Sequence, residues 1–200
     1  MRSNLDKEKI VEVAVTFFSE KGYSGTSIRD IAKALSVSNA SLYYYFEDKE
    51  DLLFNVIKSV GGDLLQVLDE ARHESTDVLD GLRRMVLRHL DLIERDGARA
   101  KIFVEEEHNL SEKYRRVVQY QHRKIYEAYV DQLKRVKEAG ILSDGPVSII
   151  AFAILGMANW CYRWYKKDGP LSIQDIGERY SELLINGIKK PKDLPKAKSR

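Results

Sequence analysis

The segment formed by residues 26–49, TSIRDIAKALSVSNASLYYYFEDK, concentrates side chains that can hydrogen-bond to nucleic acid. Ser38, Asn39 and Ser41 carry hydroxyl or amide groups that can bond to base edges in a major groove. Between them, Ala40 is small enough to allow close approach or contact with a thymine methyl group. These residue types predict an element that reads a DNA sequence directly.

A second set of groups in the same segment suits the DNA backbone. Tyr43, Tyr44 and Lys49 provide hydrogen-bond donors for phosphate oxygens. Thr26 and Ser27 place hydroxyl and amide groups at the start of an expected helix, where the N-terminal end favours anions. Contacts of this kind set the position of a protein on the duplex without reading its sequence.

Two short helices must hold these groups in place. Only residues 36–37 separate them, which is too few for an open loop, so the helices must cross at a steep angle. With Leu42 and Phe46 facing inward, the second helix turns Ala40 and Tyr44 outward. This arrangement is typical of a helix-turn-helix whose second helix enters the major groove.

Nearly every other segment also follows helical periodicity, with apolar residues three and four positions apart. Gly22 ends a first helix, and Ser27 with Asp30 predicts a capping box at the start of the second. Asp48 is a good N-cap for a long helix that runs to Ala71. Further helices are expected over residues 78–95, 98–108, 112–139, 147–165 and 172–188. The fold class is therefore all-α.

The run of residues 10–53 resembles the DNA-binding domain of the TetR family of transcriptional regulators. The resemblance lies in the phrases FSEKGYSGTSIRDIAKALSVS and SLYYYFEDKEDLL. Its most specific features are Gly22-Tyr23, Ile31-Ala32, Leu42-Tyr43 with Phe46, and Lys49-Glu50. It implies an N-terminal three-helix DNA-binding domain followed by a helical domain for ligand binding and dimerisation.

The resemblance also implies that the residues equivalent to Ser27, Ser38 to Ser41, Tyr43, Tyr44 and Lys49 touch double-stranded operator DNA. The candidate DNA-binding residues are Thr26, Ser27, Arg29, Ser38, Asn39, Ala40, Ser41, Tyr43, Tyr44 and Lys49. Two departures from the family pattern stand out. Ser36 occupies a position where the family usually has glycine, which implies a slightly strained turn. Asn39 and Ala40 replace a common lysine-glycine pair, which implies that the operator sequence is this protein's own.

The chain divides into a DNA-binding domain over residues 1–50 and a helical ligand-binding and dimerisation domain over residues 51–190. Residues 191–200 are expected to form a disordered basic tail. The net charge of +2 is concentrated near this tail, so the sequence shows no strong basic patch for DNA. The prediction of DNA binding therefore rests on the helix-turn-helix motif.

The last two expected helices predict a homodimer. The helix over residues 147–165 is apolar nearly all round, which indicates burial on more than one side. Together with the helix over residues 172–188 it can form half of an intersubunit four-helix bundle. Dimerisation also suits DNA binding, because two recognition helices must reach successive major grooves about 34 Å apart.

The C-terminal domain is rich in aromatic residues, most of which belong to a core. Large rings, a cation and an amide combine near one helix end, which suits an amphipathic ligand with an anionic part. The candidate ligand-binding residues are Phe103, Tyr126, Asn159, Trp160, Arg163 and Trp164. The segment NWCYRWYKKDGPLSIQDIGERYSELLINGI is similar to the end of a TetR subgroup that responds to acyl-coenzyme A thioesters. That similarity implies a repressor of lipid or aromatic-acid catabolism, released by its effector.

Other function classes are less favoured by the sequence. Phosphate-binding, dinucleotide-binding, hydrolase and zinc-protease motifs are absent, so we expect no catalytic residue, cofactor or metal. Glu105 and His108 have the spacing of half a metal site, but a second such motif is missing and a surface pair is favoured. Cys161 is expected to be an inert buried thiol, with a thiol sensor as the alternative.

Localisation and partners follow from the same evidence. The N-terminus lacks the apolar core of a signal peptide. The longest apolar stretch, residues 149–158, is about half of the ~20 residues that a membrane span needs. We therefore expect a cytoplasmic protein with no membrane partner. Two alternatives stay open at this point: a TetR-like regulator of efflux that senses lipophilic drugs, and a DNA-binding protein that responds to no ligand.

Overall fold

The structure is a computed structural model that describes residues 5–142 and 145–188; the predicted basic tail lies outside these ranges. The elements are α1 (Lys7–Lys21), α2 (Ile28–Ala34), α3 (Asn39–Tyr43), α4 (Lys49–His73), α5 (Val78–Arg95), α6 (Gly97–Glu105), the 3-10 helix η1 (Glu107–Asn109), α7 (Glu112–Glu138), α8 (Val147–Trp164) and α9 (Ile173–Ile188). The predicted all-α fold is confirmed.

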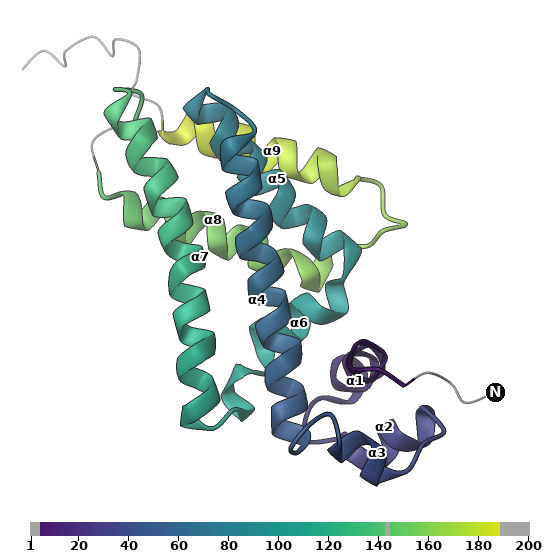
Figure 1. Cartoon of the computed structure of the whole chain (residues 1–200). Helices are drawn as coiled ribbons and strands as arrows, with labels where there is room; N and C mark the ends of the chain where they lie inside the picture. Colours follow the sequence, from purple (N-terminus) through teal and green to yellow (C-terminus); the bar gives the residue numbers. More distant parts are fainter. Residues whose placement is uncertain (1–4, 143–144, 189–200) are drawn as a thin grey trace, which may run out of the picture.

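Helices α1, α2 and α3 form a small group at one end of the molecule (Figure 1). Gly22 ends α1 as predicted, with a φ of 71° that a residue without a side chain adopts easily. At the start of α2, the Ser27 hydroxyl accepts from the Asp30 backbone N–H, and the Asp30 carboxylate accepts from the Ser27 N–H. This is the predicted capping box.

The turn between α2 and α3 has the hydrogen bonds of a Schellman motif. The N–H of Ser36 donates to the carbonyl of Lys33 at 3.1 Å, and the N–H of Val37 donates to the carbonyl of Ala32 at 3.0 Å. Ser36 has a φ of 57° and is the one non-glycine residue in the described chain with a positive φ. The serine thus occupies a backbone conformation that favours glycine, as the family comparison of the turn predicted.

Helix α4 connects this group to the rest of the molecule and begins after Asp48, whose side chain accepts from the N–H of Asp51. Its buried face carries Leu52 and Val56 near the DNA-reading end and Leu64 and Leu68 further along. The helix packs against α5, α6 and α7, and α7 runs beside it in Figure 1. One long helix therefore crosses from the helix-turn-helix into the core of the second domain.

The remaining helices surround the distal part of α4. Helix α9 packs on α5 and spans the end of the molecule that is far from α2 and α3 (Figure 1). The predicted helix over residues 98–108 is wrong at its end, because α6 stops at Glu105. The Asn109 N–H then bonds to the carbonyl of Glu106, three residues back, which winds this stretch into the tighter η1.

Helix α8 buries one face only. Ala151, Ile154 and Cys161 are buried against the bundle, whereas Phe152 is 64% exposed and Trp160 is 57% exposed. The prediction of burial on more than one side is therefore not met within a single chain. The predicted burial of Cys161 is confirmed, and burial raises the pKa of its thiol to about 11.

By length and composition alone, α8 is the one helix among the described residues that could cross a membrane. Its longest uninterrupted apolar stretch is shorter than a membrane span, but the whole helix contains only one charged residue, Arg163, and is long and apolar enough for one. The same composition is that of a helix enclosed between two protein chains. The apolar side of α8 is exposed in the single chain.

Candidate functional site

Helix α3 presents the side chains that were predicted to read DNA. Asn39 and Ala40 are exposed, and Tyr44 is 84% exposed. Leu42 and Phe46 are buried, as predicted, and hold the opposite side of this segment on the core. The short helix therefore offers an amide, a methyl group and phenolic hydroxyls to solvent on one surface.

The hydroxyl groups of Ser38 and Ser41 face each other at 2.9 Å at the start of α3. Ser38 is the N-cap and its hydroxyl accepts from the Ser41 N–H at 3.2 Å. Ser27 caps α2 in the same way, and Arg29 is exposed in the first turn of that helix. Apart from Thr26 and Lys49, the predicted DNA-binding residues thus occupy the starts of α2 and α3 and the surface of α3.

Thr26 does not offer its hydroxyl to DNA, which corrects the prediction from the sequence. Its side chain is 2% exposed, and the hydroxyl donates to the carbonyl of Gly22 at 2.9 Å and lies 3.2 Å from that of Phe17. Its backbone N–H bonds to the carbonyl of Tyr23. The residue closes the loop between α1 and α2, because both of its polar groups are used inside that loop.

Lys49 is likewise engaged inside the domain. Its ammonium group donates to the carbonyl oxygens of Tyr23 at 2.9 Å and Thr26 at 2.8 Å. The same group lies 4.0 Å from the centroid of the Tyr23 ring. Lys49 thus ties the start of α4 to the loop between α1 and α2, and its phosphate contact stays a prediction.

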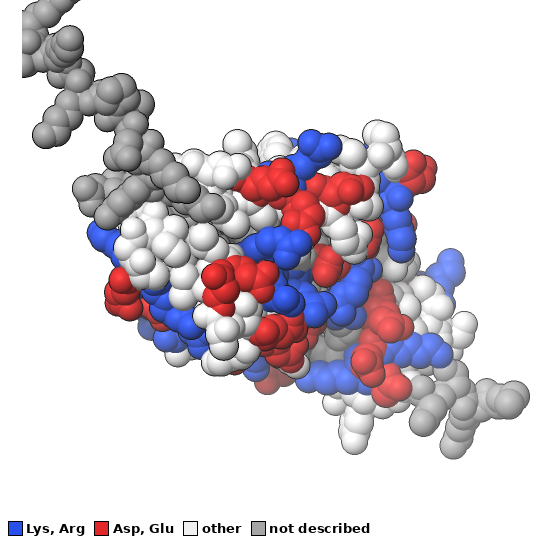
Figure 2. All heavy atoms as spheres, turned by 90° about the horizontal axis from the view of Figure 1, so that it is seen from above, with Lys and Arg blue, Asp and Glu red and all other residues white. Residues whose placement is uncertain are grey.

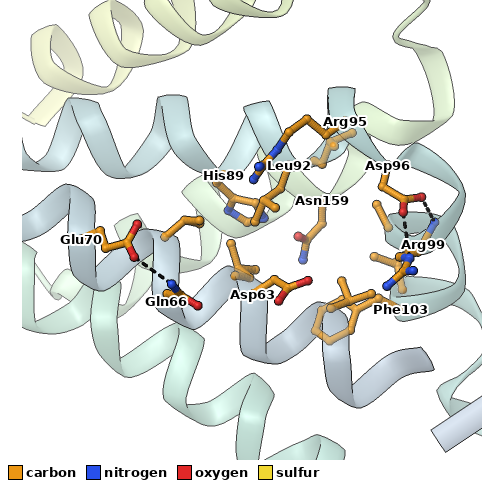
Figure 3. A pocket seen from close by; sticks show the side chains of 16 residues that line it. Asp63, Gln66, Glu70, His89, Leu92, Arg95, Asp96, Arg99, Phe103 and Asn159 are labelled. Carbon is orange, nitrogen blue, oxygen red and sulfur yellow. Dashed lines mark hydrogen bonds and ion pairs between the residues drawn. The ribbon is translucent and has the colours of Figure 1, made fainter. Parts of the chain in front are cut away.

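A cavity of about 560 Å³ lies in the second domain, between α4, α5, α6 and α8. Its lining residues are Val60, Asp63, Leu64, Gln66, Val67, Glu70, His89, Leu92, Ile93, Arg95, Asp96, Arg99, Ala100, Phe103, Val104 and Asn159. Figure 3 shows side chains from both sides pointing into this space. Its size is that of a pocket for a small organic ligand.

The charged lining residues are concentrated at the rim. Asp63, Glu70 and Arg95 are exposed. Arg99 is held by Asp96, with its Nε 2.8 Å from the carboxylate (Figure 3). The rim therefore carries both signs of charge, and the apolar lining lies behind it.

His89 is the buried polar group of the cavity wall. Its side chain is 3% exposed, and its Nδ1 lies 3.1 Å from the hydroxyl of Tyr129. Burial lowers the pKa of His89 to about 4, and a hydrogen bond with Asn159 opposes this shift only weakly. At neutral pH the ring is therefore uncharged.

Sequence reasoning did not identify His89 as a residue of the cavity. A signal was available in its position. The histidine lies on the apolar face of α5, among Met85, Val86, Leu90 and Ile93, where a polar residue needs a buried partner. That partner, Tyr129, lies forty residues away on α7, so no local pattern could identify it.

The six predicted ligand-binding residues separate into two groups. Phe103 and Asn159 line the cavity. Tyr126 stacks on Phe152 with ring centroids 4.9 Å apart and is not part of the lining. Trp160 and Trp164 are exposed and also lie outside the lining. The structure therefore does not bring these three aromatic residues to the cavity; on α8, Asn159 turns inward and its neighbour Trp160 turns outward.

Arg163 is also outside the cavity, and its predicted role as a ligand contact stays a prediction. Its guanidinium donates to the carboxylate of Glu105 at 2.7 Å and lies over the Trp160 ring. The hydroxyl of Tyr162 donates to the same carboxylate, and these bonds lower the pKa of Glu105. Arg163 is thus a structural ion-pair partner that joins α8 to α6.

Helix α6 touches both the cavity and the DNA-binding end. Phe103 faces the cavity, whereas the Lys101 ammonium donates to the carbonyl of Ser19 in α1 at 2.6 Å. One turn later, the carboxylate of Glu106 accepts from the N–H of Tyr23 at 3.4 Å. A change in the position of α6 would therefore alter its hydrogen bond to α1.

Two further observations concern charge and metals. On the face turned away from α2 and α3, acidic and basic side chains are interspersed (Figure 2). Within the described residues, no group of three or more histidine, cysteine, aspartate or glutamate side chains could hold a metal ion. Glu105 and His108, which have the spacing of half a metal site, are in local contact instead: Nδ1 of His108 lies 2.8 Å from the backbone carbonyl of Glu105.

Two family models match the chain. The model described as "Bacterial regulatory proteins, tetR family" matches residues 10–56. The model described as "Tetracyclin repressor-like, C-terminal domain" matches residues 75–188, which is more than half of the chain. The first match covers the helix-turn-helix, and the second covers α5 to α9.

Individual relatives are similar to this chain over nearly its full length. The HTH-type transcriptional repressor KstR2 of Mycolicibacterium smegmatis is 27% identical over 189 residues, covering 91% of this chain and 90% of KstR2. The crystal structure of PfmR from Thermus thermophilus is similar with a TM-score of 0.84 at 29% identity, covering 90% of this chain and 99% of PfmR. KstR2 of Mycobacterium tuberculosis has a TM-score of 0.85 at 25% identity, covering 94% and 97%. This chain therefore belongs to the TetR family and is a helix-turn-helix regulator of transcription.

Proposed function

We propose that this protein is an effector-responsive repressor, in which two copies bind a palindromic operator and a small lipophilic effector releases them. The observation that carries the proposal is that the cavity and the DNA-reading module share two helices. Helix α4 begins directly after the helix-turn-helix and lines the cavity from Val60 to Glu70. Helix α6 lines the same cavity and bonds to α1 through Lys101.

The DNA side of the proposal rests on the surface of α3. Asn39 and Ala40 are placed to contact bases, and Tyr43 and Tyr44 to contact phosphates. Arg29 and the capped start of α2 add a second phosphate contact from the neighbouring helix. Because the target is DNA, we place the protein in the cytoplasm.

The dimer rests on exposed apolar surface in α8 and α9. Ile149, Phe152 and Trp160 are exposed on α8, and Leu183 is exposed on α9. We propose that a second copy of the chain covers this surface, with an interface above ~1,000 Å². Such a dimer would place two copies of α3 in successive major grooves, about 34 Å apart.

The effector is proposed to be an acyl-coenzyme A thioester. A cavity of about 560 Å³ whose lining includes Leu64, Ile93 and Phe103 accommodates an acyl or polycyclic group, and the exposed Arg95 at the rim suits an anionic part outside it. An effector can act as a switch only if it binds the DNA-incompetent arrangement more tightly. One observation favours the second candidate, a regulator of efflux: Asp63 and Glu70 at the rim would attract a lipophilic cation.

The test is to select an operator from a random duplex library with the purified protein and to follow its binding by fluorescence anisotropy. Acyl-coenzyme A thioesters of several chain lengths are then titrated, with free coenzyme A and lipophilic cations in parallel. Release by thioesters but not by coenzyme A supports the proposal. Release by cations alone supports the efflux regulator. If no compound releases DNA, the protein is a ligand-independent binder.

A further inference from the structure

His89 differs from the other buried polar side chains of the described chain. Thr26, Gln132 and Ser181 each donate to a backbone carbonyl inside the fold. His89 instead has one ring nitrogen beside Tyr129 and its other side at the cavity wall, where Asn159 also lies (Figure 3). Two polar groups from α5 and α8 thus meet in an otherwise apolar part of the cavity.

The surroundings of this pair are buried and apolar. Leu64, Ile93 and Phe103 are each at least 94% buried and line the cavity together with His89. A polar group in such surroundings is costly unless it has a hydrogen-bond partner. His89 already bonds to Tyr129 and Asn159, but an amide has more donors and acceptors than this one bond uses. A ligand oxygen that displaces water from the half-buried Asn159 can take up that remaining capacity.

The charge state of His89 selects the kind of partner. Because burial lowers its pKa to about 4, the ring is neutral and has no charge with which to attract a carboxylate. The Asn159 amide is neutral as well. Charged groups of the cavity lie at the rim, where Arg95 is exposed. We therefore expect an anionic part of the ligand to lie at the rim, and an uncharged oxygen to lie beside His89 and Asn159.

We propose that His89 and Asn159 form a subsite for a neutral hydroxyl or keto oxygen on the apolar body of the effector, remote from its anionic part. This inference rests on the proposed function, since it describes the ligand of the same cavity. The effector is then an oxygenated acyl or polycyclic acid derivative rather than a plain hydrocarbon one. Asn159 was identified from the sequence, whereas its pairing with His89 is visible only in the fold.

The experiment compares two probes that differ by one hydroxyl: dodecanoyl-coenzyme A and ω-hydroxydodecanoyl-coenzyme A. Dissociation constants are measured by calorimetry for the full-length protein and for three variants. Asn159→Leu and His89→Phe remove the two polar groups of the subsite. Gln66→Leu is the matched control, because it removes an amide from the rim of the same cavity.

We expect the wild type to bind the hydroxylated probe about tenfold more tightly, as one added hydrogen bond in a buried site allows. Asn159→Leu and His89→Phe should each abolish this preference, and Gln66→Leu should retain it. Equal affinity of the wild type for both probes would overturn the inference and leave the proposed effector class intact. So would a preference that survives in both Asn159→Leu and His89→Phe. Binding of neither probe would refute the effector class and this inference together.

If His89→Phe does not fold, Asn159→Leu decides the matter alone. Asn159 is only half-buried, and its replacement leaves the contact between His89 and Tyr129 in place. A preference that persists in Asn159→Leu would then count against the proposed subsite. Thermal unfolding of each variant without ligand shows which proteins are folded.

Discussion

The ammonium group of Lys49 donates a hydrogen bond to the backbone carbonyl of Tyr23, with 2.9 Å between the two atoms. It also donates to the carbonyl of Thr26 and lies over the Tyr23 ring. The first residue of α4 thereby holds the loop between α1 and α2. Since α4 also lines the cavity, this clamp lies on the helix that joins the cavity to the helix-turn-helix.

The clamp predicts that Lys49→Met destabilises the protein and weakens binding to all DNA sequences alike. Loss of the charged donor should lower the free energy of unfolding by about 2 kcal/mol. Urea unfolding and anisotropy measure the two effects. Arg29→Gln is the control, because this exposed residue should weaken DNA binding without lowering stability. A stable Lys49→Met protein with normal affinity would show that the clamp has no role.

Asn39 and Tyr43 should have different roles on DNA. Asn39→Ala should change the preference between bases at one operator position, with a change in binding free energy of ~1–3 kcal/mol. Tyr43→Phe should reduce affinity for all sequences, because it removes a donor assigned to phosphate. Binding of each variant to a set of single-base operator variants distinguishes the two effects. The same uniform loss for both would contradict the assignment of Asn39 to base reading.

Lys101 should transmit the effector signal from α6 to α1. Its bond to the carbonyl of Ser19 is made on the DNA-binding side of α6, and Lys101 is not part of the cavity lining. We expect Lys101→Met to bind effector normally but to need several-fold more of it for release of DNA. Lys124→Met is the matched control, since Lys124 pairs with Glu127 on α7. Identical release curves for wild type and Lys101→Met would disprove this role.

His89 should make stability depend on pH. Burial lowers its pKa to about 4, against roughly 6.5 in an unfolded chain. Between these values the unfolded chain binds a proton that the folded chain does not, so stability falls as the pH falls. Lowering the pH from about 7.5 to about 5 should cost about 2 kcal/mol through this residue.

Urea unfolding at the two pH values checks this prediction in wild type and His89→Phe. The variant should lose less stability on acidification. The pKa of His122 is also lowered by burial, but this residue is present in both proteins, so the difference between them isolates His89. His73→Gln is a control at an exposed histidine and should behave as wild type does. An unchanged pH dependence in His89→Phe would contradict the assignment.

The exposed side of α8 predicts the effect of a charge at the proposed dimer interface. Phe152→Glu should convert a dimer to a monomer at micromolar concentration, because it would bury an unpaired carboxylate between apolar surfaces. Light scattering measures the mass. Tyr120→Glu on α7, which is 58% exposed, should leave the dimer intact. A wild-type monomer would already refute the interface.

The helix-turn-helix could be predicted from the sequence because its determinants are local. Ser27 with Asp30, and Gly22 at the end of α1, act within one helical turn, and the structure contains each of them. Leu42 and Phe46 are inward by helical periodicity alone. These contacts join residues a few positions apart, so the chain specifies them before it folds.

The lining of the cavity depends on contacts between residues far apart in the sequence, so it could not be predicted from local patterns. Asn159 and Trp160 are neighbours in the sequence, yet one faces the cavity and the other faces solvent. Which of them turns inward is set by how α8 packs on α5 and α7, and hence by side chains far away in the chain. Periodicity locates an apolar helix but does not fix its rotation when most of its faces are apolar.

The partners of the polar side chains also depend on residues far apart in the sequence. Arg163 and Lys49 carry charges suited to ligands or phosphates, and the sequence could not show that Glu105 and the carbonyl of Tyr23 already bind them. His89 finds Tyr129 only when α5 and α7 come together. The sequence by itself determined the family, the helices and the DNA-reading surface through local spacing. Tertiary packing alone decided which polar groups are used inside the fold and which remain for a ligand.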